Sequence, residues 1–132
     1  MQFELTKEFL DHLNNAVTAG AEQEVLMLIK DLHPADIAEI LDEQSLNQAK
    51  AFLNFLPKEL SSDVIIELDE DTREKFLDAL TSQEIASQFI DNMDSDDAAD
   101  VIGELSDEKR DEVISHIEDI EQASDILKLL NY

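Results

Sequence analysis

A repeat of 12 or 13 residues is the feature that most constrains the fold of this chain. From Leu56 onward, apolar residues recur at spacings of 12, 12, 13, 12 and 12, and the 24-residue gap before Leu56 fits two more units, with Gln44 between them. These closing residues are Leu32, Leu56, Leu68, Leu80, Met93, Leu105 and Ile117. Helix-start signals follow the closing residues at His33-Pro34, Pro57, Asp69, Thr81, Asp94 and Ser106, and Ser45 follows Gln44 in the same way. The pattern predicts a chain of short helices, each beginning where the previous one ends.

The apolar residues inside the units have helical spacing. Ala98, Val101, Ile102 and Leu105 fall at i, i+3, i+4 and i+7, which places them on one face of a helix. Capping boxes are predicted where Ser45 precedes Gln48 by three residues and where Thr81 precedes Glu84 by three. Helices of two to three turns are unstable alone, so each must bury its apolar stripe against its neighbours.

Residues 1–31 precede the array and are predicted to form two helices, the first ending near Gly20 and the second running from about Ala21 to Leu32. We predict one all-α domain over residues 1–132. It is a right-handed, armadillo-like superhelix of about ten short helices. Residues 1–31 supply its N-terminal helices and residues 32–132 the short-helix repeat array.

Charge and composition exclude several classes of function. The net charge of −24 disfavours nucleic acid and anionic membrane surfaces as partners, since both require clusters of Lys and Arg. The chain has no Cys, no apolar run of about 18 residues and no signal peptide at its start. His12, His33 and His116 lie in separate units, and no catalytic motif is present. We therefore expect a protein that inserts no segment into the membrane and is not an enzyme.

Ten acidic residues lie between positions 91 and 112, opposed in that segment only by Lys109 and Arg110. Helix capping and first-turn dipole effects explain part of this excess, with Asp94 as the expected cap. They do not explain Asp100 and Glu104, which continue an i, i+4 stripe from Asp96 and repel one another. The stripe indicates binding of a metal or a basic partner, although a solvated acidic face remains the open alternative.

Oxygen ligands on a helix favour a hard cation. An EF-hand is excluded because Ala99 occupies the loop position that requires Gly. One or two carboxylates on a rigid helix suit Mg²⁺, which keeps several waters, better than Ca²⁺, which takes six to eight oxygens. Such a site is weak alone, and it becomes useful when a second acidic surface supplies the remaining ligands.

The sequence Leu-His-Pro-Ala-Asp-Ile-Ala-Glu-Ile-Leu at residues 32–41 resembles the opening signature of the cytosolic N-terminal domain of MgtE-family magnesium transporters. The start at Leu56-Pro57 and the sequence Asp-Ser-Asp-Asp-Ala-Ala-Asp-Val at residues 94–101 match that domain in order and spacing. The resemblance implies a domain on the cytoplasmic side of the membrane that precedes a CBS pair and a dimeric, Mg²⁺-selective pore. The CBS pair and the transmembrane domain are absent from this chain, which we expect to be an excised regulatory domain or a natural truncation.

The resemblance also implies a mechanism. Mg²⁺, with Ca²⁺ as a substitute, bridges the acidic faces of the N and CBS domains and closes the pore. The family's metal-contacting acids fall on Asp96 and Asp100, with a third on Asp63, where family members can carry Glu. Asp97 and Glu104 are secondary neighbours that would assist through water. The alternative is a helical-repeat interaction adaptor, similar to the arrays of the flagellar motor-switch protein, without metal specificity.

Overall fold

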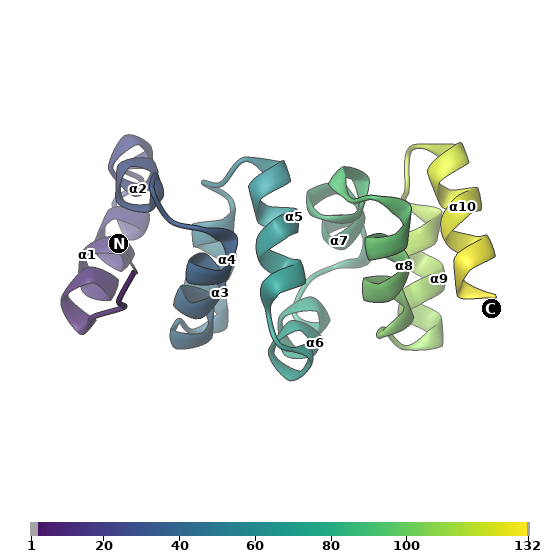
Figure 1. Ribbon diagram of the computed structural model, residues 1–132, viewed down its shortest axis with the longest axis horizontal. Coiled ribbons are helices and arrows are strands. Elements are labelled where there is room, and N and C mark those ends of the chain that lie inside the picture. Colours follow the sequence, from purple (N-terminus) through teal and green to yellow (C-terminus); the bar gives the residue numbers. More distant parts are fainter. Residues whose placement is uncertain (1–2, 132) are drawn as a thin grey trace.

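Ten short α-helices follow one another along the chain, as the repeat predicts (Figure 1). The computed structural model describes residues 3–131, and over that range it contains these helices, one 3₁₀ helix and no β-strand. The helices are α1 (Lys7–Thr18), α2 (Glu22–Ile29), α3 (Pro34–Glu43), α4 (Leu46–Leu53), α5 (Lys58–Glu67), α6 (Glu70–Asp78), α7 (Ser82–Gln88), α8 (Ser95–Gly103), α9 (Asp107–Ser115) and α10 (Ile120–Leu130), with the 3₁₀ helix η1 (Ile90–Asn92) between α7 and α8. The all-α prediction is confirmed.

Every predicted helix start from α3 to α9 occupies the N-cap position that the sequence indicates. At α4, the Gln48 N–H donates to Ser45 Oγ at 3.2 Å and the Ser45 N–H donates to Gln48 Oε1 at 3.2 Å, which completes the predicted capping box. Thr81 and Glu84 form the same box at α7. Gly20 has a φ of +72°, the left-handed conformation that follows a helix C-terminus and favours glycine.

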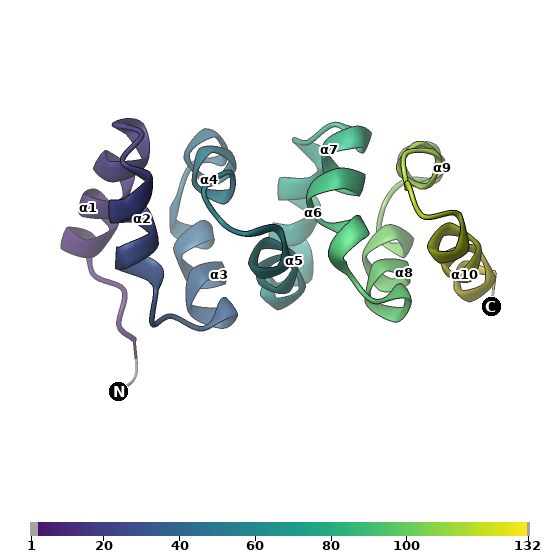
Figure 2. The ribbon, with the colours of Figure 1, turned by 90° about the horizontal axis from the view of Figure 1, so that it is seen from above.

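The helices form an elongated array whose two ends lie at opposite poles (Figure 1). Viewed from above, α3, α5 and α8 lie along one side, and α4, α7 and α9 lie along the other (Figure 2). The closest packing joins next-but-one helices, since α3 packs on α5, α7 on α9 and α8 on α10. Before the array, α1 packs on α2 and on α4. The handedness of the superhelix stays a prediction.

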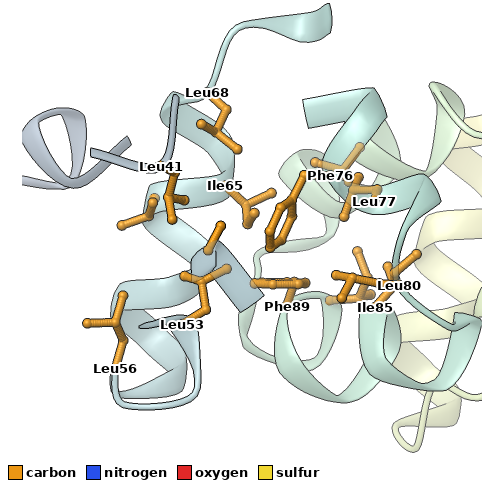
Figure 3. Close-up of a cluster of buried hydrophobic side chains, with 14 of the residues drawn as sticks. Leu41, Leu53, Leu56, Ile65, Leu68, Phe76, Leu77, Leu80, Ile85 and Phe89 are labelled. Carbon is orange, nitrogen blue, oxygen red and sulfur yellow. The ribbon is translucent and has the colours of Figure 1, made fainter. Parts of the chain in front are cut away.

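One apolar core runs through the array. The closing residues of the repeat units from Leu56 to Ile117 are all buried, whereas Leu32 is half-buried. Figure 3 shows the central part of the core, where the rings of Phe76 and Phe89 meet edge to face with centroids 6.4 Å apart. Because each unit contributes its stripe to a shared core, the short helices stabilise one another.

Polar side chains also connect segments that lie far apart in the sequence. The Lys109 ammonium donates to the carbonyl oxygens of Leu77 and Leu80, at 3.0 and 2.8 Å. The Gln122 amide donates to those of Ile90 and Met93, at 3.1 and 2.8 Å. These carbonyls lie where α6 and η1 end, and those of Leu77 and Ile90 also accept the N–H groups of Leu80 and Met93. The two side chains therefore add to the turn hydrogen bonds there and join α9 to the end of α6 and α10 to η1.

Candidate functional site

Helix α8 carries Asp96 and Asp100, the first two predicted metal ligands. Its buried face consists of Ala98, Ala99, Val101 and Ile102, and these apolar side chains fix which residues point outward. Asp94 occupies the N-cap position, but its side chain makes no capping hydrogen bond, so the prediction that this carboxylate caps the helix is wrong. The carboxylate instead lines an acidic hollow formed with residues of η1 and α10.

Asp96 and Asp100 lie one helical turn apart on α8, and both are exposed. Over residues 3–131, neither carboxylate forms an ion pair or accepts a hydrogen bond from another side chain. They line a shallow groove between α8 and α10, together with Leu129 and Leu130. The two acids therefore form a free pair beside an apolar strip.

Glu104 is paired with Arg73, which makes it a weaker candidate for a metal ligand than Asp96 or Asp100. The Arg73 Nε donates to Glu104 Oε1 at 2.8 Å, and Nη2 donates to Oε2 at 2.9 Å, a bidentate pair. Both side chains are largely buried, with 15% and 22% of their surface exposed. Arg73 on α6 thus supplies the cation for a carboxylate that the local sequence leaves unopposed, and the paired carboxylate is unavailable to a metal unless this pair breaks.

The remaining predicted ligands do not complete a site. Asp97 lies in the first turn of α8 and is half-buried, and Asp63 is exposed on α5. Figures 1 and 2 show α6 and α7 between α5 and α8 along the array. Within the described range 3–131, no three Asp, Glu or His side chains come close enough together to hold a metal ion. The structure therefore brings Asp96 and Asp100 together but does not bring Asp63 to them.

Sequence reasoning missed the acidic hollow at the other end of α8. It is lined by Asp91, Met93, Asp94, Ser95, Asp119, Glu121, Gln122 and Asp125. Burial raises the pKa of Asp91, and repulsion from Glu118 and Asp119 acts in the same direction, whereas a hydrogen bond from the Glu118 backbone and the charge of Lys58 oppose the shift. The Asp91 Oδ1 atom is buried and has no hydrogen-bond partner among the described residues. The environment of Asp91 is set by Glu118, Asp119 and α10, which lie more than 25 positions away, so no local sequence signal could have indicated it.

We expect the substitution Asp91→Asn to stabilise the fold at neutral pH by about 0.5 kcal/mol, because it removes a partly desolvated charge. A carboxyl whose pKa is raised in the folded state costs stability as the pH rises above its unfolded value of 3.8. The gain should therefore be present at pH 7 and disappear as the pH falls well below 3.8, where Asp91 is protonated in both the folded and the unfolded state. Urea unfolding at several pH values measures it.

Asp31→Asn provides the control, because it removes the same charge from an exposed position in the turn after α2. If the two variants gain equally, the benefit comes from the lower net charge, and the environment of Asp91 has no special effect.

Comparison with known proteins identifies the family. Residues 32–132 match the family described as the MgtE intracellular N domain. The chain belongs to this family. The predicted resemblance to the MgtE family is thus confirmed, and the MgtE N domain is an intracellular domain. The MgtE N domain belongs to a transporter family and not to an enzyme family.

A solved structure described as the soluble part of a magnesium transporter has the same fold as this MgtE N domain. The TM-score is 0.80 at 20% identity, and the match covers 96% of this chain and 49% of that one. The chain therefore spans about half the length of that protein. No curated protein matches it in sequence. No helix within residues 3–131 is long and apolar enough to cross a membrane.

Proposed function

We propose that this MgtE N domain is the cytosolic Mg²⁺-sensing domain of a magnesium transporter. The observation that carries the proposal is the free, exposed pair of carboxylates at Asp96 and Asp100. At high cytosolic Mg²⁺, the pair would hold an ion whose other ligands come from the CBS domains of the same transporter chain. The two domains then dock, and the dimeric pore closes.

The chemistry of the pair suits Mg²⁺. Carboxylate oxygens are hard ligands, and Mg²⁺ commonly takes one or two of them while keeping several waters. Ca²⁺ can substitute, although it needs more oxygens than the pair offers. With Glu104 held by Arg73 and Asp63 on a separate helix, the domain by itself provides an incomplete site. An incomplete site binds weakly, so a second surface is needed to reach useful affinity.

The groove beside the pair supports docking there. Leu129 and Leu130 of α10 line it together with the two carboxylates, and 41% of the Leu129 surface is exposed. An apolar strip next to a metal-binding pair offers a partner domain buried contact area in addition to the shared ion. Docking through both would follow the Mg²⁺ concentration by linkage.

We expect Mg²⁺ to bind the isolated domain with a dissociation constant of about 1 mM or weaker, as befits a site with two protein ligands. A titration followed by ¹⁵N NMR should show shifts that concentrate on α8 around Asp96 and Asp100, with smaller changes at Asp63. The double variant Asp96→Asn/Asp100→Asn should abolish the concentrated shifts, because it removes both charged ligands.

Glu70→Gln/Glu74→Gln is the matched control, since it neutralises another exposed i, i+4 pair, on α6. It should leave the shifts on α8 unchanged. Equal small shifts over all acidic residues, or equal losses in the two double variants, would mean a diffuse ion atmosphere. They would favour a helical-repeat adaptor without metal specificity.

A further inference from the structure

A half-open apolar groove lies between α3 and α4 on one side and α6 on the other. Its volume is about 480 Å³, and its apolar lining consists of Leu41, Leu46, Ala49, Leu68 and Phe76. Three of these side chains, Leu41, Leu68 and Phe76, are labelled among the core residues in Figure 3. The groove thus gives access to the side of the core at the middle of the array, away from the Asp96 and Asp100 pair on α8.

Two residues of the groove have groups that an occupant could contact: an exposed apolar side chain and a buried acceptor without a hydrogen bond. Leu46, the first residue of α4, has 47% of its surface exposed. Gln44 donates from Nε2 to Asn14 Oδ1 at 2.9 Å, but its buried Oε1 has no hydrogen-bond partner within residues 3–131. An exposed leucine next to an unused acceptor fits an occupant that brings both an apolar side chain and a hydrogen-bond donor.

The charge around the groove selects a cationic occupant. Asp42 and Asp78 are exposed and line it from opposite sides, on α3 and α6. Lys75 is the one base among the lining residues, and it lies at helical spacing from both Asp71 and Asp78, so the local charge stays negative. The net charge of −24 repels a second copy of the chain, nucleic acid and anionic lipid alike.

We propose that this groove binds a basic amphipathic segment of another protein. A bulky apolar side chain of the segment packs against Leu46 and Phe76, and its Lys or Arg residues pair with Asp42 and Asp78. A donor from the segment satisfies Gln44 Oε1. This is the helix-in-groove mode of recognition, in which apolar anchors give affinity and flanking charges give orientation.

The distribution of polar groups favours a peptide over a small molecule. Small-molecule sites converge several polar groups on an enclosed ligand. Here the charged groups are exposed along both sides, and Gln44 Oε1 is the one buried unpaired acceptor among the described lining residues. Exposed acids on both sides of an apolar groove match a helical segment that has an apolar face flanked by basic residues.

The test uses an 18-residue helical peptide with leucines along one face and lysines on the others, with binding to the whole chain followed by fluorescence anisotropy and NMR. We expect shifts around Leu46, Ala49 and Phe76. Leu46→Lys should weaken binding by about tenfold, because it places a like charge at the anchor position. Met27→Lys makes the same change at another exposed apolar residue, 75% exposed on α2, and should change affinity by less than about twofold.

Three outcomes would overturn the proposal. A peptide of the same composition with its leucines scattered around the helix should bind much more weakly, and equal binding would show attraction by charge alone. Equal losses in Leu46→Lys and Met27→Lys would place the contact elsewhere. Saturation of the groove by the dye 8-anilinonaphthalene-1-sulfonate, without any binding of the peptide, would make it a small-molecule site. Circular dichroism of each variant checks that the fold is kept.

Discussion

Replacing Arg73 with alanine is expected to lower the free energy of unfolding by about 3 kcal/mol, because it breaks a largely buried ion pair and uncaps a helix. The guanidinium holds both oxygens of Glu104, and this bond raises the pKa of Arg73. Its Nη1 donates to the carbonyl oxygens of Ile65, Ile66 and Leu68 at 3.3, 3.1 and 2.9 Å, at the end of α5. The substitution leaves a charge and three acceptors without this donor. Urea unfolding monitored by circular dichroism gives the cost.

Arg110→Ala is the matched control. Arg110 pairs with Asp107 at 3.0 Å within the first turn of α9, and the Asp107 side chain is 90% exposed. Exposed pairs of this kind contribute about 0.5 kcal/mol or less. A double-mutant cycle with Glu104→Gln separates the ion pair from the carbonyl contacts. If Arg73→Ala costs no more than Arg110→Ala, Arg73 does not join α5, α6 and α8 energetically.

Phe89→Ala is expected to cost about 4 kcal/mol, a large part of the stability of a small domain. Phe89 connects α7 to η1, and its side chain is fully buried, with the ring packed edge to face on Phe76. The Phe89 carbonyl accepts a hydrogen bond from Ser62 Oγ at 2.8 Å, which joins this residue to α5. Alanine would leave a cavity where three elements meet, and thermal and denaturant unfolding measure the loss.

Two further substitutions test whether the cost of Phe89→Ala comes from lost packing. Phe55→Ala removes a half-buried ring from the turn after α4 and should cost about half as much. Phe89→Leu keeps most of the volume and should recover much of the loss. Equal costs for Phe89→Ala and Phe55→Ala would contradict a central packing role for Phe89.

The helix boundaries could be predicted because their causes are local. A capping side chain accepts from the N–H group three residues later, so Ser45 with Gln48 and Thr81 with Glu84 can be recognised from the sequence alone. The closing residues follow from the same short period, since each ends one helix and faces the shared core.

The pairing of Arg73 with Glu104 could not be predicted in this way. The two residues are 31 positions apart, which is not a multiple of the 12-residue unit, so the repeat does not indicate that they meet. The local count of charges set only Lys109 and Arg110 against the acidic segment. Lys109 in fact donates to backbone carbonyls at the end of α6 and just after it, and the cation for Glu104 comes from another unit.

The candidate site is predictable only in part, because spacing within one helix can be derived from the sequence and the stacking of separate helices cannot. Helical spacing places Asp96 and Asp100 on one face, and the structure has both exposed there. Whether Asp63 approaches them depends on how α5 and α8 stack, which spacing within a helix does not determine. The role of these residues as ligands stays a prediction until Mg²⁺ is titrated.

The polar contacts that cross the array have a consequence for how the chain folds. The bonds of Ser62 with Phe89, Arg73 with Glu104, Ser82 with Glu112 and Gln44 with Asn14 all join residues 27 to 31 positions apart. None of these four contacts brings together residues from the two ends of the chain. The cost of closing a loop is therefore small and similar at every step, and a nucleus formed in any neighbouring group of helices can propagate in both directions. Such a low contact order is typical of chains that fold quickly and expose little unpaired surface on the way.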